Sequence, residues 1–90
     1  MPSFLRKHPH AVVMFHASWC SHCRQLLPAF KAAAARVKLP LVMMQCDNAP
    51  ELVEQYGLRG FPTILRFGAG RPIEYNGDRS PDSIVQFAMT

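Results

Sequence analysis

The sequence feature that most constrains this fold is a junction near the N-terminus, where a strand-like run passes directly into a helical pattern. Residues 11–16 (AVVMFH) are apolar and rich in β-branched side chains, which predicts a buried strand. From Cys20 to Lys38 the apolar period becomes that of a helix. The helical stripe consists of Leu26, Phe30, Ala33 and Val37. A Cys-x-x-Cys pair, Cys20 and Cys23, lies at the junction.

Five further elements follow along the chain, and changes of the apolar period mark most of them. The later predicted elements are a strand at 41–46, a helix capped by Asn48 and ended by Gly57, strands at 63–67 and 72–75, and a helix from Ser80 to about Met89. The order is βαβαββα. Two βαβ units followed by a hairpin predict an α/β fold with a mixed central sheet and helices on both faces.

Composition limits both the number of domains and the classes of partner. The chain has 90 residues, of which 49% are hydrophobic and 18% charged, and this predicts a single folded domain over residues 1–90. The formal net charge of +4 is spread without a run of five like charges, so no nucleic-acid partner is expected. The longest apolar runs fall far short of the roughly 20 residues of a membrane span. Basic and histidine residues at positions 6–10 occupy the place of a signal peptide's apolar region, so no signal peptide is visible.

The Cys-x-x-Cys pair has a physical rationale at a helix start. Cys20 would meet unpaired backbone N–H groups and the positive end of the helix dipole, which favour its thiolate over its thiol. At the end of a helix it is also expected to be exposed and therefore reactive. Cys23 follows one turn later on the same face, at a spacing that closes a small disulfide ring. His22 adds partial positive charge, which stabilises the reduced form and makes the disulfide more oxidising.

Two other interpretations of the cysteines stay open at this point. An irregular zinc site could use His8 and His10 with the cysteine pair, although no second Cys pair follows and no metal or other cofactor is expected. A purely structural disulfide is the second alternative, but a bridge that closes so short a loop stabilises little. The third cysteine, Cys46, is predicted to be a buried thiol that acts as a small hydrophobe.

Several motifs together resemble the thioredoxin superfamily, and within it the catalytic a-type domains of protein disulfide isomerases. They are Trp19-Cys-x-His-Cys after an apolar strand, Pro28 five residues beyond Cys23, Asp47 at the end of the next strand, Tyr56–Thr63 (YGLRGFPT), and Tyr75-x-Gly77-x-Arg79. The resemblance covers roughly residues 11–90 and implies a thioredoxin-like three-layer fold.

The resemblance also implies roles for the candidate catalytic residues. Cys20 would be the nucleophile and Cys23 the buried resolving thiol, with His22 beside them. Arg79 resembles the arginine that can approach the resolving cysteine and lower its pKa. The implied activity is thiol–disulfide oxidoreduction, in which protein disulfides are formed, reduced or isomerised.

Three residues would bind the protein or peptide substrate. Pro62 would be preceded by a cis peptide bond and face the two sulfurs, and this bond would present the Phe61 backbone to an extended substrate. Trp19 would pack beside the motif and shape the docking surface.

The chain departs from the family pattern at three places. Ser21 replaces the usual glycine, and Met14 stands where the family commonly buries an acid that relays protons to the resolving cysteine. The chain is also short at its N-terminus, where residues 1–10 form only a remnant segment. Strand 41–46 would then be an edge strand, which we expect to be covered by a second copy, by the N-terminal residues or by an upstream segment.

Two alternative functions remain at this stage. A thioredoxin-like general reductant is one, and it is disfavoured by His22 and by the Tyr75-x-Gly77-x-Arg79 pattern. A catalytically weak binding module with the same fold is the other, and Met14 is its best support. The isomerase-like residues point to an oxidising lumen such as the endoplasmic reticulum, whereas the lack of a visible signal peptide leaves the cytoplasm open.

Overall fold

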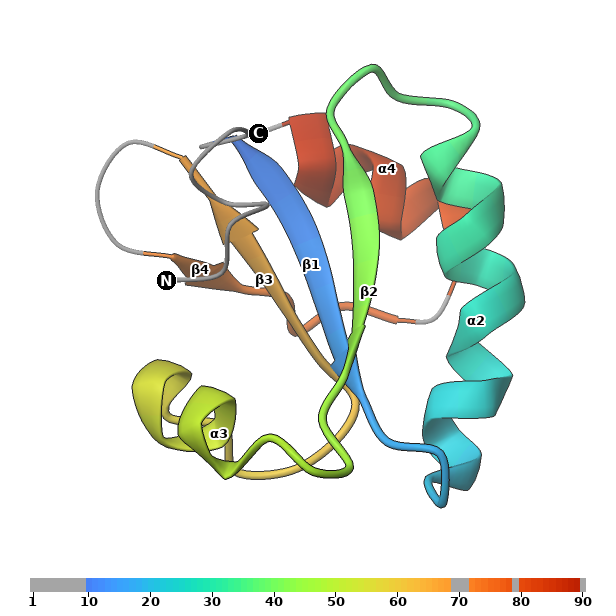
Figure 1. Ribbon diagram of the computed structural model, residues 1–90. Helices are drawn as coiled ribbons and strands as arrows, with labels where there is room; N and C mark the ends of the chain where they lie inside the picture. The colour runs from blue at the N-terminus through green and yellow to red at the C-terminus, as the bar shows by residue number, and fades with distance from the viewer. Residues whose placement is uncertain (1–9, 69–71, 79, 90) are drawn as a thin grey trace.

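The elements of the computed structural model follow the predicted order βαβαββα (Figure 1). The structure describes residues 10–68, 72–78 and 80–89, so most of the predicted N-terminal remnant lies outside the described residues. The elements are β1 (Ala11–His16), α2 (Ser21–Ala34), β2 (Leu41–Gln45), α3 (Pro50–Tyr56), β3 (Thr63–Phe67), β4 (Ile73–Glu74) and α4 (Pro81–Met89).

The four strands form one mixed sheet in the order β2-β1-β3-β4. β1 pairs in parallel with β2 and antiparallel with β3, and β3 pairs antiparallel with β4. The central strand β1 is buried along nearly its whole length, as its continuous apolar run predicts. β2 lies at an edge of the sheet, which confirms the prediction for this strand.

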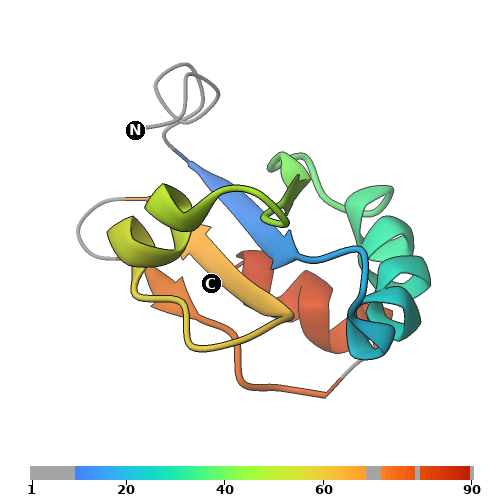
Figure 2. The same ribbon diagram turned by 60° about the horizontal axis from the view of Figure 1, so that its bottom comes forward.

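Helices cover both faces of the sheet and give the predicted three layers (Figure 2). On one face, Val12 and Met14 of β1 pack with α2 and α4. On the other, Val13 and Phe15 pack with the partly buried side chains of α3. Alternate side chains of a strand point to opposite faces, so β1 supplies both halves of the core.

Four predicted boundaries need correction. Strand β4 covers only Ile73–Glu74 instead of 72–75. Helix α2 ends at Ala34 instead of Lys38, because Ala35 already forms the cap. The Ala35 N–H donates to the Lys31 carbonyl, and the Arg36 N–H donates to the Ala33 carbonyl. Strand β2 stops one residue before Cys46. The cap of α3 is Ala49, without a side-chain hydrogen bond, and not Asn48. Pro50 takes the first helical position, which fixes the cap at the residue directly before it.

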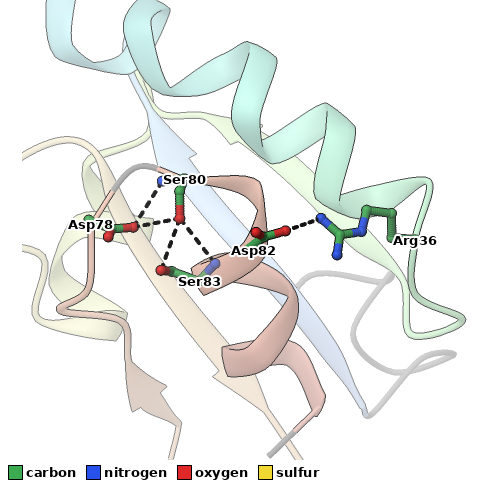
Figure 3. A network of polar contacts seen from close by, with 5 residues as sticks. All are labelled: Arg36, Asp78, Ser80, Asp82 and Ser83. Carbon is green, nitrogen blue, oxygen red and sulfur yellow. Dashed lines mark hydrogen bonds and ion pairs between the residues drawn. The ribbon is translucent and has the colours of Figure 1, made fainter.

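The C-terminus of α3 and the start of α4 agree with the sequence. Gly57 ends α3 with a left-handed φ of 62°, a conformation that glycine adopts without steric penalty. At the start of α4, Ser83 N–H donates to the Ser80 hydroxyl at 3.2 Å, and Asp78 accepts from both the N–H and the hydroxyl of Ser80 (Figure 3). An ion pair of 2.5 Å between Arg36 and Asp82 links α4 to the end of α2. No helix in the described part of the chain is long and apolar enough to span a membrane.

Candidate active site

The two cysteines lie where the β1–α2 loop enters the helix. Cys20 is the N-cap of α2, and its Sγ accepts a hydrogen bond of 3.2 Å from the Cys23 N–H. The Cys20 carbonyl accepts from the Arg24 N–H at 3.3 Å, so the residue joins the first helical turn. The sulfur of Cys20 therefore faces unpaired backbone donors and the positive end of the helix dipole, as predicted.

Cys20 is less exposed than the sequence predicts. Only 5% of its surface is accessible, because Ala17 and Phe61 pack around it. The expectation of an exposed Cys20 is therefore wrong. The exposed part of this region is its neighbour Trp19, which is 70% accessible.

Cys23 is buried more deeply, with 1% of its surface accessible. Burial raises the pKa of its thiol to about 11, and a hydrogen bond with Cys20 adds to the shift. A backbone hydrogen bond with Ala17 acts in the opposite direction. Cys23 is thus protonated at neutral pH and needs a proton acceptor before it can act as a nucleophile.

The predicted substrate-binding residues lie together beside Cys20. The Phe61–Pro62 peptide bond is cis, as expected. The Cys20 thiol donates to the Phe61 carbonyl across 3.5 Å. The ring of Trp19 meets that of Phe61 edge-on, with centroids 5.9 Å apart. A hollow of about 180 Å³ is lined by Pro62, Tyr75 and Gly77, so the Tyr75-x-Gly77 motif also lies beside the cis-proline.

A hydrogen-bonded clamp holds the loop that carries Trp19 and Cys20. Asp47 accepts from the N–H of Ser18 at 2.9 Å and also from its hydroxyl. Arg24 donates to the Ser18 carbonyl at 2.9 Å from the other side. The two donors on Ser18 hold the pKa of Asp47 below its usual range, and the charge of His16 contributes.

The sequence identified Asp47 only as part of a family pattern and missed Ser18 altogether. A signal was nevertheless present, because both residues follow neighbouring parallel strands, β1 and β2. Polar side chains that follow the carboxyl ends of adjacent parallel strands lie near one another. This clamp fixes the turn in which the Cys20 N–H donates to the Ala17 carbonyl at 3.2 Å.

The remaining candidate residues lie in different settings. His22 is exposed on the first turn of α2, between the two cysteines in sequence. Arg79 lies outside the described residues. Met14 is fully buried in β1, and the described part of the chain contains no buried polar or charged side chain other than the thiols. Among residues 10–68, 72–78 and 80–89, no group of three or more His, Cys, Asp or Glu could hold a metal ion, while His8 of the alternative zinc site lies outside these ranges.

A comparison with known protein families identifies the family of this chain. The thioredoxin family pattern matches residues 2–90. The chain belongs to the thioredoxin family. The resemblance drawn from the cysteine motif and the cis-proline segment is thereby confirmed, and so is the thioredoxin-like fold.

Curated relatives of this thioredoxin-family chain are named as protein disulfide isomerases. It is 39% identical over 89 residues to protein disulfide isomerase-like 1-4 of Oryza sativa subsp. japonica, and the alignment covers 93% of this chain and 16% of that protein. It is 38% identical over 91 residues to protein disulfide-isomerase of Gallus gallus, and this alignment covers 92% of this chain and 18% of that protein. The chain therefore spans less than a fifth of the length of each of these two relatives.

Solved structures with similar folds include proteins related to these. The J-Trx1 fragment of ERdj5 superposes with a TM-score of 0.85 at 31% identity, over 92% of this chain and 41% of that one. The zinc-bound form of human ERp44 gives a TM-score of 0.85 at 25% identity, over 96% and 28%.

Proposed function

We propose that this chain is a thiol–disulfide oxidoreductase of the isomerase type, which forms, reduces or rearranges disulfides in protein or peptide substrates through Cys20 and Cys23. The observation that carries the proposal is the asymmetry of the two thiols. Cys20 Sγ lies at the positive end of α2 against the Phe61 carbonyl, whereas Cys23 lies behind it, buried and protonated. This asymmetry supports a division of roles in which Cys20 reacts with the substrate and Cys23 releases it.

The reaction balances without a cofactor. In the reduced domain, the Cys20 thiolate attacks a substrate disulfide, a Cys20–substrate S–S bond forms, and the second substrate sulfur leaves as a thiolate. Cys23 then loses its proton, attacks Cys20 Sγ and expels the reduced substrate. Two electrons have then passed to the substrate, and the reverse sequence oxidises it. If another substrate thiol displaces Cys20 instead, the disulfide is rearranged with no net electron transfer.

Trp19, Phe61 and Pro62 would hold the substrate during these steps. Trp19 offers a large exposed apolar surface next to the sulfur, and amphipathic aromatic rings of this kind are common anchors in binding sites. The backbone of Phe61 lies beside Cys20, where an extended substrate segment can form strand-like hydrogen bonds. Arg79 keeps its proposed role of easing ionisation of Cys23.

Alkylation tests the assignment of the nucleophile. At pH 6, iodoacetamide should modify Cys20 well before Cys23 and Cys46, because burial raises the pKa of both other thiols. Mass spectrometry of the digested protein would follow each site, and labelling in the unfolded protein is the control. Equal rates at all three cysteines in the folded protein would contradict the assignment.

Turnover and potential test the activity itself. The chain should rearrange a scrambled-disulfide protein, and Cys20→Ser should abolish this. A reduction potential near about −180 mV would support the isomerase type, and one near about −270 mV would favour the reductant. His22→Pro should lower the potential by tens of millivolts, since it removes partial positive charge beside the thiolate. An unchanged potential would remove His22 from the site.

A second candidate, a binding module with little turnover, is favoured by one observation. Met14 is buried where it cannot accept a proton, and no buried carboxylate lies in the described part of the chain. Slow release of substrate would turn the same site into a covalent holder of thiol-bearing proteins. Absence of turnover together with a trapped Cys20 mixed disulfide would support this function over the first.

The setting of the domain is also part of the proposal. Residues 1–90 would form one thioredoxin-like domain that works in an oxidising lumen like that of the endoplasmic reticulum, in keeping with its isomerase-type relatives. The edge strand β2 would be covered by a second copy or by a preceding segment, because Met43 is 39% exposed there and an uncovered apolar edge invites pairing. Rapid amide exchange of residues 41–45 in a monomer would count against this cover.

A further inference from the structure

A second, larger hollow lies on the α3 side of the cis-proline loop. Its volume is about 660 Å³, within the range of about 300–1,000 Å³ typical of ligand sites. The loop of residues 56–63 forms most of its wall, and Leu65 and Glu74 complete it. These two residues face each other across the β3–β4 pair. Of its lining residues, only Phe61 and Pro62 have a role in the proposed exchange reaction.

Phe61 connects the hollow to the reacting sulfur. Its carbonyl lies 3.5 Å from Cys20 Sγ, and the same residue lines the hollow together with Pro62. A polypeptide whose disulfide reaches Cys20 can therefore extend its neighbouring residues past Phe61 toward this space.

The hollow carries two opposite charges. Arg59 and Glu74 both line it, both are exposed, and neither forms a hydrogen bond or ion pair with another residue that the structure describes. A ligand with one acidic and one basic group would complement these two side chains.

The floor of the hollow has room for such side chains. A Cβ atom built on Gly60 would meet no atom within 4 Å. Gly60 does not have the left-handed backbone conformation of Gly57, so a side chain can be introduced there without backbone strain.

We propose that this hollow is a specificity subsite for the polypeptide segment that flanks the attacked disulfide, with Arg59 binding an acidic side chain of the client and Glu74 a basic one. That the client carries a disulfide rests on the proposed function. The subsite itself binds through charge and needs no exchange, so the two can be tested separately.

The test measures binding first. Short synthetic peptides without tryptophan, in which serine replaces cysteine, carry an Asp and a Lys at scanned positions, and matched peptides carry Asn and Gln. Trp19 is the only tryptophan of the chain and reports binding through its fluorescence. One charged arrangement should bind about fivefold more tightly than its neutral match, the size expected of two exposed ion pairs, and salt should remove the difference.

Charge reversal identifies the residues. Arg59→Glu should lose the preference for Asp and gain one for Lys at the same peptide position, and Glu74→Lys should do the converse. Lys38→Glu is the matched control, because it changes the net charge as Arg59→Glu does but lies beyond the end of α2 opposite to Cys20. It should leave every preference unchanged. Gly60→Leu should weaken binding of all peptides by filling the space, and Gly60→Ala should weaken it less.

Two results would overturn the inference. One is equal binding of charged and neutral peptides at every position. The other is a loss of affinity in Arg59→Glu that is the same for acidic, basic and neutral peptides. The cysteine-containing versions of the peptides separate this inference from the proposed function. Exchange at Cys20 without charge preference would refute only the subsite, whereas charge-dependent binding without exchange would refute only the oxidoreductase.

Discussion

The two faces of the sheet are built differently, although β1 supplies side chains to both. On the α2–α4 face, two helices bury Leu26, Phe30 and Ile84 against the sheet, and the Arg36–Asp82 pair links them at the rim. On the other face, α3 is a single short helix with no fully buried residue. The reactive dithiol is attached to the first face, and the larger hollow lies on the second. The well-packed face positions the sulfurs, while the more open face leaves room for a client.

Truncation of one apolar side chain on each face is the strongest test of this difference. Phe30 is 1% exposed in the α2–α4 cluster, so Phe30→Ala should reduce the free energy of unfolding by about 3–5 kcal/mol. Leu52 on α3 is only partly buried, so Leu52→Ala should reduce it by about 1 kcal/mol. Urea unfolding measures both. Similar losses for the two variants would show that the faces are equally well packed.

Cys23 on α2 and Cys46 after β2 are both buried thiols, and the pH dependence of stability in the alkaline range compares them. The pKa of Cys23 rises from 9.0 to about 11 in the folded chain, chiefly through burial. Between these values the unfolded state gives up its proton and the folded state keeps it, so stability is fully present below pH 9 and falls as pH rises toward 11. Cys23→Ala should flatten this fall. Cys46, whose pKa burial also raises, should contribute in the same direction, and Cys46→Ala is the comparison.

Urea unfolding curves between pH 8 and 11 would measure these slopes. If neither substitution changes the pH dependence, other groups control it, such as the tyrosines, whose pKa values burial also raises.

The Ser18–Asp47 clamp joins the ends of β1 and β2, at the point where both faces meet the dithiol loop. Ser18→Ala should lower the free energy of unfolding slightly, because it removes a solvent-exposed hydrogen bond to the Asp47 carboxylate. It should also slow exchange at Cys20 and alter Trp19 fluorescence, because the loop carries both residues. Ser18→Thr keeps the hydroxyl and should restore the rate and the spectrum. A stability loss without any change in exchange rate would limit the clamp to a structural role.

Sequence patterns predicted most of this architecture, and the exceptions have physical causes. Buried strands and amphipathic helices follow from local apolar periods, so β1, β3 and α4 lie close to their predicted ranges. The cap of α3 was misplaced because Asn48 has a strong intrinsic capping preference, yet Pro50 fixes the first turn. The burial of Cys20 could not be predicted locally, since Phe61, distant in sequence, covers it.

On the α3 face, Tyr56 buries a polar group without a hydrogen bond. Its ring packs between Phe15 and Phe67, with centroids 5.3 and 5.5 Å away, but its buried hydroxyl has no hydrogen-bond partner among the described residues. Tyr56→Phe removes that hydroxyl and keeps the ring. The substitution should leave stability unchanged or raise it by up to about 1 kcal/mol, since an unpaired buried polar group is unfavourable. A clear loss of stability in urea unfolding would show that the hydroxyl is bonded in solution.

The last comparison concerns the release of substrate and Met14, on the well-packed face. Cys23 must lose its proton to expel a substrate from Cys20, and its pKa of about 11 opposes this. Met14 is fully buried in the same half of the core as Leu26, three residues beyond Cys23 on α2, and it cannot accept the proton. Mixed disulfides should therefore accumulate at neutral pH and resolve faster as pH rises toward the pKa of Cys23.

Met14→Glu places an acceptor in that core and should speed resolution several-fold near neutral pH, although burial of the acid will lower stability. Quenched-flow trapping of the Cys20 mixed disulfide between pH 6 and 9 measures the rate, and Met14→Gln is the control, since it is polar but has no basic carboxylate. Equal acceleration by Glu and Gln would mean that loosened packing, and not proton transfer, exposes Cys23. If Met14→Glu has no effect while Arg79→Ala slows resolution, Arg79 promotes the ionisation of Cys23 and a buried acid is not needed. If neither substitution changes the rate, ionisation of Cys23 does not limit release, and the well-packed face positions the thiols without controlling their turnover.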